Sequence, residues 1–102
     1  MSYDVTILNK SGKPIDLWLS VTYNYNAILQ RVFQDEKGIY SLDGKLVKDT
    51  DLVPLLQRLS SHVPDDDYWA PTDGNVSETI IALIKMSELG RCADAEATWN
   101  VL

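Results

Sequence analysis

An alternation of apolar and polar residues over positions 15–24 constrains the fold of this chain more than any other sequence feature. The apolar set is Ile15, Leu17, Leu19, Val21 and Tyr23, and the set between them is mostly polar: Asp16, Trp18, Ser20, Thr22 and Asn24. Successive side chains of a strand point to opposite faces of a sheet. The pattern therefore predicts a strand of an antiparallel sheet with one buried face and one partly wet face.

Two further segments predict the rest of the sheet. Residues 3–8 alternate in the same way, and the polar segment 9–14 can form a turn because Gly12 tolerates a positive φ, so a hairpin is expected. Near the other end, Ala97, Trp99 and Val101 alternate with more polar neighbours and predict a closing strand. We expect about three strands.

The first helix is predicted to follow the hairpin. Either Asn24 or Asn26 can cap it, apolar residues recur at helical spacing up to Phe33, and glycine at Lys37-Gly38 marks its expected end. The next segment, residues 38–45, has turn chemistry at its Asp-Gly pair and is compatible with either a small hairpin or an irregular connection.

Two more helices are predicted in the second half. Asp49-Thr50-Asp51 supplies caps for an apolar stripe that runs from Leu52 to Val63. The segment Asn75-Val76-Ser77-Glu78 fits a capping box, and the helix that follows is expected to stop at Gly90. The elements indicate one α+β domain over residues 1–102, with a small antiparallel sheet packed against three helices.

Composition narrows the class of function. The net charge is −6, from 15 acidic and 9 basic residues, which disfavours direct nucleic-acid binding because a phosphate backbone requires clustered Lys and Arg. No apolar run approaches the length of a membrane span, and the first residues lack the pattern of a secretory signal. We expect a cytoplasmic protein without membrane contact.

Signatures of catalysis are not visible in the sequence. The single histidine, His62, and the single cysteine, Cys92, provide no nucleophile–base pair and no multi-cysteine metal site. The glycines lie in separate turns, so neither a P-loop nor a dinucleotide fingerprint is formed. The aspartates after Pro64 do not follow the EF-hand spacing. We expect no enzyme activity, no cofactor and no metal.

Residues 64–75 are the strongest candidate for a functional site. They combine four carboxylates with two large aromatic residues in a stretch that predicts neither regular helix nor ordinary strand. Aromatic rings anchor protein interfaces and carboxylates steer a basic partner. We therefore expect a small acidic binding protein that contacts a protein partner, with a homo-oligomer also compatible. The candidate residues are Asp65, Asp66, Asp67, Tyr68, Trp69 and Asp73, together with Trp18 on the polar face of its strand.

A second hypothesis places a small-ligand or nucleotide site at the predicted junction of strand and first helix. Free backbone N–H groups and amide side chains at such a junction can face an anion. A module of this kind would sequester its ligand. The candidate residues are Tyr23, Asn24, Tyr25 and Asn26, together with Asn75.

Three short motifs resemble a family of small uncharacterised proteins encoded by bacteriophages and bacteria. They are Val21-Thr22-Tyr23-Asn24, Gly38-Ile39-Tyr40 and the segment Pro71-Thr72-Asp73-Gly74-Asn75 before an amphipathic helix. The resemblance covers roughly residues 15–102. It implies a phage or prophage setting, and the protein partner expected from residues 64–75 would then be a host or competitor protein.

Overall fold

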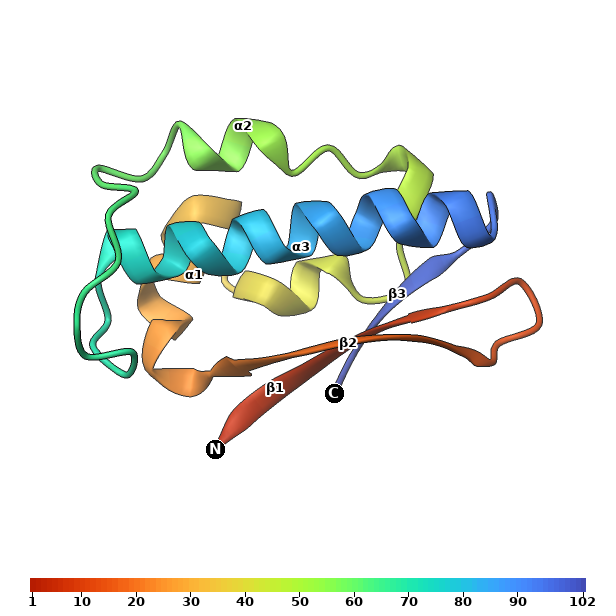
Figure 1. The fold of residues 1–102 in the computed structure, drawn as a ribbon, viewed down its shortest axis with the longest axis horizontal. Helices are drawn as coiled ribbons and strands as arrows, with labels where there is room; N and C mark the ends of the chain where they lie inside the picture. Colours follow the sequence, from red (N-terminus) through yellow and green to blue (C-terminus); the bar gives the residue numbers. More distant parts are fainter.

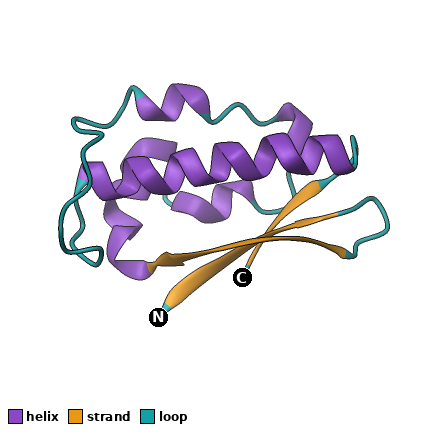
Figure 2. Cartoon of the chain, viewed as in Figure 1, coloured by secondary structure: helices purple, strands orange, loops and turns teal.

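The computed structural model describes all residues 1–102 and has a three-stranded antiparallel sheet with helices on one face (Figures 1 and 2). The strands are β1 (Ser2–Leu8), β2 (Pro14–Thr22) and β3 (Thr98–Val101), in the order β2-β1-β3. The helices are α1 (Asn26–Phe33), α2 (Val53–Leu56) and α3 (Asp73–Ala93). Three short 3₁₀ helices connect them: η1 (Tyr23–Tyr25), η2 (Gly38–Leu42) and η3 (Val47–Asp49). The predicted α+β class is confirmed.

The sheet turns the apolar residues of β2 toward the core, with Val21 buried and Ile15, Leu17 and Leu19 half-buried. Tyr23, predicted in the same set, lies beyond the strand in η1 and is exposed, so that part of the prediction is wrong. Val5 pairs with Leu19 and with Val101, and Ile7 pairs with Ile15 and with Trp99, so these side chains form the face that packs under the helices. The long helix α3 lies across this face and contributes Val76, Ile80 and Leu83, all fully buried (Figure 1). One continuous core of aliphatic and aromatic side chains therefore holds sheet and helices together.

The other side of the sheet is open. Its side chains are mostly polar or small and include Asp4, Thr6, Trp18, Ser20 and Asn100, and no helix covers them (Figure 1). Trp18 is 66% exposed there. The expectation of one partly wet face is confirmed, and we call this side the open face.

Two predicted helix ends are wrong. The first helix ends at Phe33, four residues before Lys37-Gly38, because Gln34 takes a left-handed conformation with φ of 54° that closes the helix. The third helix runs through Gly90 instead of stopping there. A Cβ at Gly90 would lie 2.8 Å from Ile7 Cδ1, so this glycine marks a close approach of helix to sheet and not a helix end.

The second helix is much shorter than predicted. It covers only Val53–Leu56, and the chain then continues without regular structure to Thr72. Leu59 is still buried, but Val63 is 76% exposed, so the apolar stripe does not extend to it. The segment 38–45 is an irregular connection built on η2, and no hairpin forms.

The core and the surface of α3 allow a matched stability test. We expect Leu83→Ala to lower the free energy of unfolding by about 2–5 kcal/mol, because Leu83 is fully buried and its loss leaves a cavity. Leu89→Ala is the control, since Leu89 lies on the same helix but is exposed, and its effect should stay within about 0.5 kcal/mol. Urea unfolding followed by tryptophan fluorescence measures both. Equal effects would contradict the packing described here.

Candidate functional site

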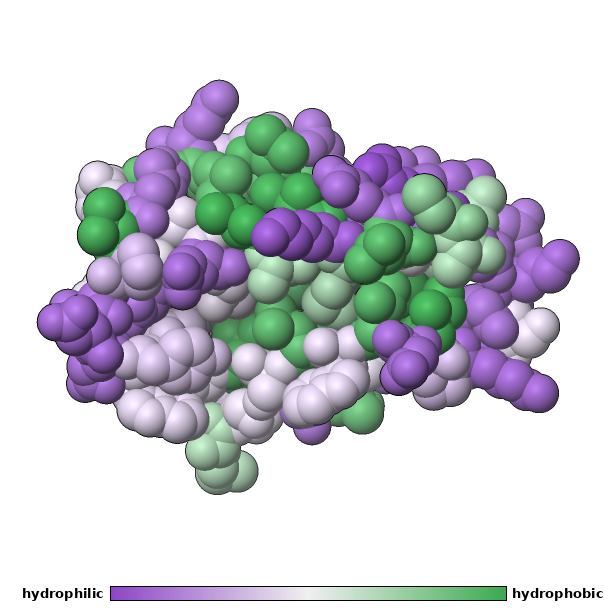
Figure 3. All heavy atoms as spheres, in the orientation of Figure 1, coloured by the Kyte–Doolittle hydropathy of each residue, from purple (hydrophilic) through white to green (hydrophobic).

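The acidic stretch predicted as a binding site forms a tight surface turn, residues 65–70, which we call the acidic-aromatic turn. The side chains of Asp65, Asp66 and Asp67 are exposed, and the rings of Tyr68 and Trp69 are 51% and 59% exposed. The two rings pack edge to face with centroids 5.2 Å apart. Figure 3 shows hydrophilic atoms beside pale residues of intermediate hydropathy at the left end, where Figure 1 places this segment. Carboxylates and rings thus share one surface.

Two of the three acids build the turn itself. Asp65 Oδ1 accepts a hydrogen bond from the backbone N–H of Asp67 (2.8 Å), and Asp67 Oδ1 accepts one from the N–H of Trp69 (3.0 Å). Such side-chain to backbone bonds are the usual way in which aspartate stabilises a turn. Asp66 has no hydrogen bond and no ion pair within the chain. Its carboxylate is free for an external partner.

Asn75 of α3 fixes the acidic-aromatic turn to the body of the protein. It is buried in the first turn of α3, and its Oδ1 accepts a hydrogen bond from the N–H of Asp65 (2.9 Å). Its Nδ2 donates to the carbonyls of Asp67 and Ala70 (2.9 Å each) and approaches that of Tyr68 at 3.4 Å. One amide side chain therefore satisfies several backbone groups of the turn, and the shape of the turn depends on it.

Gly74 lets the incoming chain lie directly against the helix. A Cβ at this position would lie 1.7 Å from the carbonyl oxygen of Val63, so only glycine fits. His62 lies beyond the end of α2, which stops at Leu56. Its Nδ1 is 2.7 Å from the hydroxyl oxygen of Ser77. The segment before the acidic-aromatic turn is therefore packed onto α3 and is not a loose connection.

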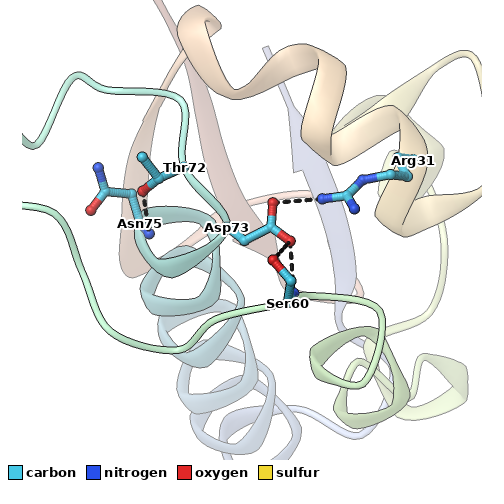
Figure 4. Close-up of polar contacts among 5 residues, drawn as sticks. All are labelled: Arg31, Ser60, Thr72, Asp73 and Asn75. Carbon is cyan, nitrogen blue, oxygen red and sulfur yellow. Dashed lines mark hydrogen bonds and ion pairs between the residues drawn. The ribbon is translucent and has the colours of Figure 1, made fainter.

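Asp73 lies in α3 and not in the loop where the sequence placed it (Figure 4). The cap of the helix is Thr72, whose Oγ1 accepts a hydrogen bond from the N–H of Asn75 (3.2 Å), so the predicted capping box at Asn75 is wrong. Asp73 Oδ2 accepts hydrogen bonds from the N–H and hydroxyl of Ser60 (2.7 and 2.9 Å), and Oδ1 pairs with Arg31 at 2.6 Å. This carboxylate is engaged inside the chain.

These contacts change the acidity of Asp73. The backbone hydrogen bond from Ser60, followed by the Ser60 hydroxyl and the Arg31 guanidinium, holds the pKa of Asp73 below its usual value, although partial burial opposes the shift. The ionised form accepts these bonds more strongly than the protonated form. Asp73 therefore ties Ser60, Arg31 and the start of α3 together most strongly while it is charged.

The junction proposed as a ligand site lies against the same turn. Tyr25 is buried and donates its hydroxyl hydrogen to the carbonyl of Tyr68, and Asn24 Nδ2 donates to the carbonyl of Trp69 (3.0 Å). Asn26 Oδ1 accepts from the hydroxyl of Tyr3 (2.9 Å). Burial raises the pKa of Tyr25 and so keeps its hydroxyl protonated as a donor. The two predicted sites thus form one connected structure.

Tyr23 differs from the other junction residues because its side chain makes no hydrogen bond within the chain, and its ring is partly exposed. The ring packs at a tilt against that of Tyr3, with centroids 4.4 Å apart, and Tyr3 also contacts Tyr40 edge to face at 5.1 Å. Its ring is therefore part of a small tyrosine cluster. The remaining polar groups named for a ligand, at Asn24, Asn26 and Asn75, are bonded within the chain.

A groove connects the turn to the open face. It has a volume of about 320 Å³ and is lined by Met1, Ser2, Ser20, Thr22, Tyr68 and Trp69. Ser20 and Trp18 are alternate residues of β2 and share the open face, so Trp18 lies beyond the far end of this groove. Trp18 and the turn are candidates from the sequence, but Ser2, Ser20 and Thr22 are not. Nothing in their spacing indicates that the turn lies against this end of the sheet.

The chain contains neither a metal-ligand cluster nor a membrane-spanning helix. No group of three or more His, Cys, Asp or Glu side chains is close enough together to hold a metal ion. No helix combines the length and the apolar character needed to cross a bilayer.

Comparison of the chain with protein-family models found no match, and comparisons with curated proteins and with solved structures found none either.

Gly74→Ala tests the close packing of the chain on α3. We expect it to lower the free energy of unfolding by about 2–3 kcal/mol, because a backbone carbonyl must move to admit the methyl group. Gly90→Ala is the matched control in the same helix. There the obstacle is the end of the Ile7 side chain, and a gain in helix propensity of about 1 kcal/mol offsets it. Chemical denaturation of both variants should separate them, and equal stabilities would refute the packing.

Asp73 should make stability depend on acid pH. Because its folded-state pKa lies below the unfolded value of 3.8, its contribution is complete above that value and is lost as the pH falls through the folded pKa. We expect Asp73→Asn to reduce the loss of stability on acidification, measured by urea unfolding between about pH 2.5 and pH 7. Asp66→Asn is the control, since Asp66 has no internal partner. An unchanged pH profile in Asp73→Asn would contradict this assignment.

Proposed function

We propose that this chain is a small acidic, non-catalytic binding protein that contacts a protein partner through the acidic-aromatic turn and the adjoining groove. The observation that carries the proposal is the combination of an internally fixed backbone with outward side chains. The carbonyls of Tyr68 and Trp69 are hydrogen-bonded to the body of the protein, yet their rings remain half exposed. Rings held in place in this way bury area on binding with little loss of conformational entropy.

The charge of the surface indicates the kind of partner. Asp65, Asp66 and Asp67 have no cation beside them, since the one ion pair of the chain is Arg31–Asp73. The net charge of −6 adds a long-range field of the same sign. A positively charged protein surface complements both, and such complementarity raises the rate of association.

The setting and the location are part of the same proposal. The motifs at Val21–Asn24 and Gly38–Tyr40 support an origin in a phage or prophage, where a host or competitor protein would be the partner. A cytoplasmic location fits a partner of that kind. Neither statement is needed for the binding test that follows.

Two substitutions test the role of the turn without disturbing its backbone. Trp69→Ala removes an exposed ring, and Asp66→Asn removes a charge that has no internal partner. Immobilised protein should retain a partner from bacterial lysate. Each substitution should raise the dissociation constant of the complex about tenfold, as expected for an interface anchor. Calorimetry with the purified partner measures this, and the effect of Asp66→Asn should diminish at high salt.

Matched controls lie at the far end of α3. Leu89→Ala and Glu88→Gln make equivalent changes at exposed positions away from the turn, and the partner should bind them as it binds the unmodified protein. If Trp69→Ala and Asp66→Asn bind as well as these controls, the turn is not the binding site.

A further inference from the structure

The two edges of the sheet differ in a way that the proposed function does not use. The edge formed by β3 is covered, because Trp99 exchanges hydrogen bonds with the segment at Gly44 and Lys45 (2.8 and 2.9 Å) and Val101 donates to Asp43 Oδ1 (2.9 Å). The edge formed by β2 has no such cover. No backbone group of residues 15–21 bonds to any segment other than β1. We call it the free edge.

The register identifies which groups face outward at this edge. Asp4 exchanges backbone hydrogen bonds with Leu102 on the β3 side (3.0 and 2.9 Å), so its neighbours Tyr3 and Val5 face β2. Antiparallel partners alternate between bonded and non-bonded pairs. On β2, Leu19 and Val21 therefore bond to β1, and the N–H and C=O groups of Trp18 and Ser20 point away from the sheet.

Only half of the free edge is protected against pairing. Near the hairpin, Pro14, the charged Asp16 and a β-bulge opposite Thr6 and Ile7 interrupt the edge, and these are the usual devices that prevent strand addition. Residues 18–22 have neither proline, charge nor bulge. They lie beside the groove that leads to Tyr68 and Trp69.

The surroundings of the unprotected half specify the charge of an occupant. Asp4 lies opposite Ser20 on the open face, Asp16 lies on the same strand, and the acidic-aromatic turn lies at the other end. Asp4, Asp16 and the three acids of the turn are anionic, although the groove itself is lined from the turn by the rings of Tyr68 and Trp69. A strand that added here would place alternate side chains on the open face, which carries Asp4 and Asp16, and the side chains between them beside the half-buried Leu19.

We propose that the free edge of β2 binds an extended segment of the partner in which Lys or Arg alternates with apolar residues, as a fourth, antiparallel strand that pairs with Trp18 and Ser20. The inference rests on the proposed function, since it assigns the partner a binding mode and a charge at the same surface. Backbone hydrogen bonds supply affinity in strand addition, and alternate side chains supply specificity. The antiparallel direction follows that of the existing sheet.

A nine-residue peptide that alternates lysine and valine, blocked at both ends, is the probe. It is titrated into the isotopically labelled full chain, and amide resonances and hydrogen exchange are followed by NMR. We expect saturable shifts at Trp18 and Ser20 and exchange slowed about tenfold there, because hydrogen-bonded amides exchange only on opening. A peptide with glutamate in place of lysine should not bind. Equal binding of the two peptides, or of neither, would overturn the proposal.

Methylated peptides test the backbone pairing without changing the protein. In antiparallel pairing the lysines share a face with Trp18 and Ser20, so their N–H groups are the ones that bond to the edge. N-methylation at the lysines should abolish binding, whereas N-methylation at the valines should preserve it. Retained binding in both cases would rule out strand addition, and loss only with the methylated valines would rule out the antiparallel direction.

A triple substitution tests the charge. Asp65, Asp66 and Asp67 changed together to asparagine keep the Oδ1 acceptors of the turn, and peptide affinity should fall about tenfold. The control changes Asp35 and Asp51 to asparagine and Glu88 to glutamine, which alters net charge equally at remote positions. An equal loss in the control would overturn the role of the turn.

Two further outcomes separate this inference from related ones. Concentration-dependent protection of Trp18 and Ser20 without peptide, together with a dimer in light scattering, would show that a second copy occupies the edge and would overturn the proposal. If a captured partner depends on Trp69 and Asp66 while both edge amides exchange unchanged in the complex, the proposed function stands and strand addition fails. Protection of both amides in that complex would support the two together.

Discussion

The acidic-aromatic turn depends on one buried amide side chain. Asn75 lies in the first turn of α3 under residues 65–70, where its Oδ1 accepts from the N–H of Asp65 and its Nδ2 donates to the carbonyls of Asp67 and Ala70. Those two carbonyls also accept backbone N–H groups within the turn, so Asn75 adds the bonds that join the turn to the helix. Aspartate could not replace it, because an ionised carboxylate has no donor and would face the carbonyl oxygens of Asp67 and Ala70. Asp65 and Asp67 shape the turn through local hydrogen bonds, but Asn75 of α3 attaches the turn to the rest of the protein. The shape of the exposed turn and the stability of the N-terminal end of α3 are therefore coupled.

Three consecutive residues share this attachment, and each does so by different chemistry. Asp73 uses charge to hold Ser60 and Arg31, Gly74 uses the lack of a side chain to admit the backbone of Val63, and Asn75 uses its amide. The connection from α2 to α3 is long for a small domain, and such segments are usually functional or mobile. Here it is fixed along its course, which favours a functional role for the part that projects.

The sequence was most informative where a single period decided the structure. The alternation predicted β2, the side of the sheet that its apolar residues face and the exposed Trp18, because a strand needs only local geometry to sort its side chains. It did not predict that the strand ends at Thr22 and leaves Tyr23 exposed. Helix ends were predicted less well. Gly90 resembles a helix stop in sequence, but its reason is the approach of Ile7 from a strand more than 80 positions away. Tertiary contacts of that kind leave no local pattern.

The candidate site shows the same division. Composition identified the acids and rings of residues 65–69, since unusual residue types are visible without coordinates. Their hydrogen bonds with Asn24 and Tyr25 leave no pattern in the sequence, so the two segments predict alternative sites. Asp73 and Asn75 were assigned to binding because they are polar and near the loop. The structure engages both internally, and a signal for this existed in Thr72, whose spacing to Asn75 suits a helix cap.

The energetics of exposure connect the turn to the free edge. Half-exposed rings and unpaired backbone groups both forgo stabilisation that burial would provide, and each is easily removed by a single substitution to a polar residue or a proline. This chain protects the hairpin half of β2 with Pro14, Asp16 and a bulge, whereas residues 18–22, next to the rings, have no proline, charge or bulge. Protection of one half shows that the edge is not simply tolerated along its length. The unprotected half lies where a bound strand would also reach the carboxylates, so a single extended partner can satisfy the backbone, the rings and the charge together.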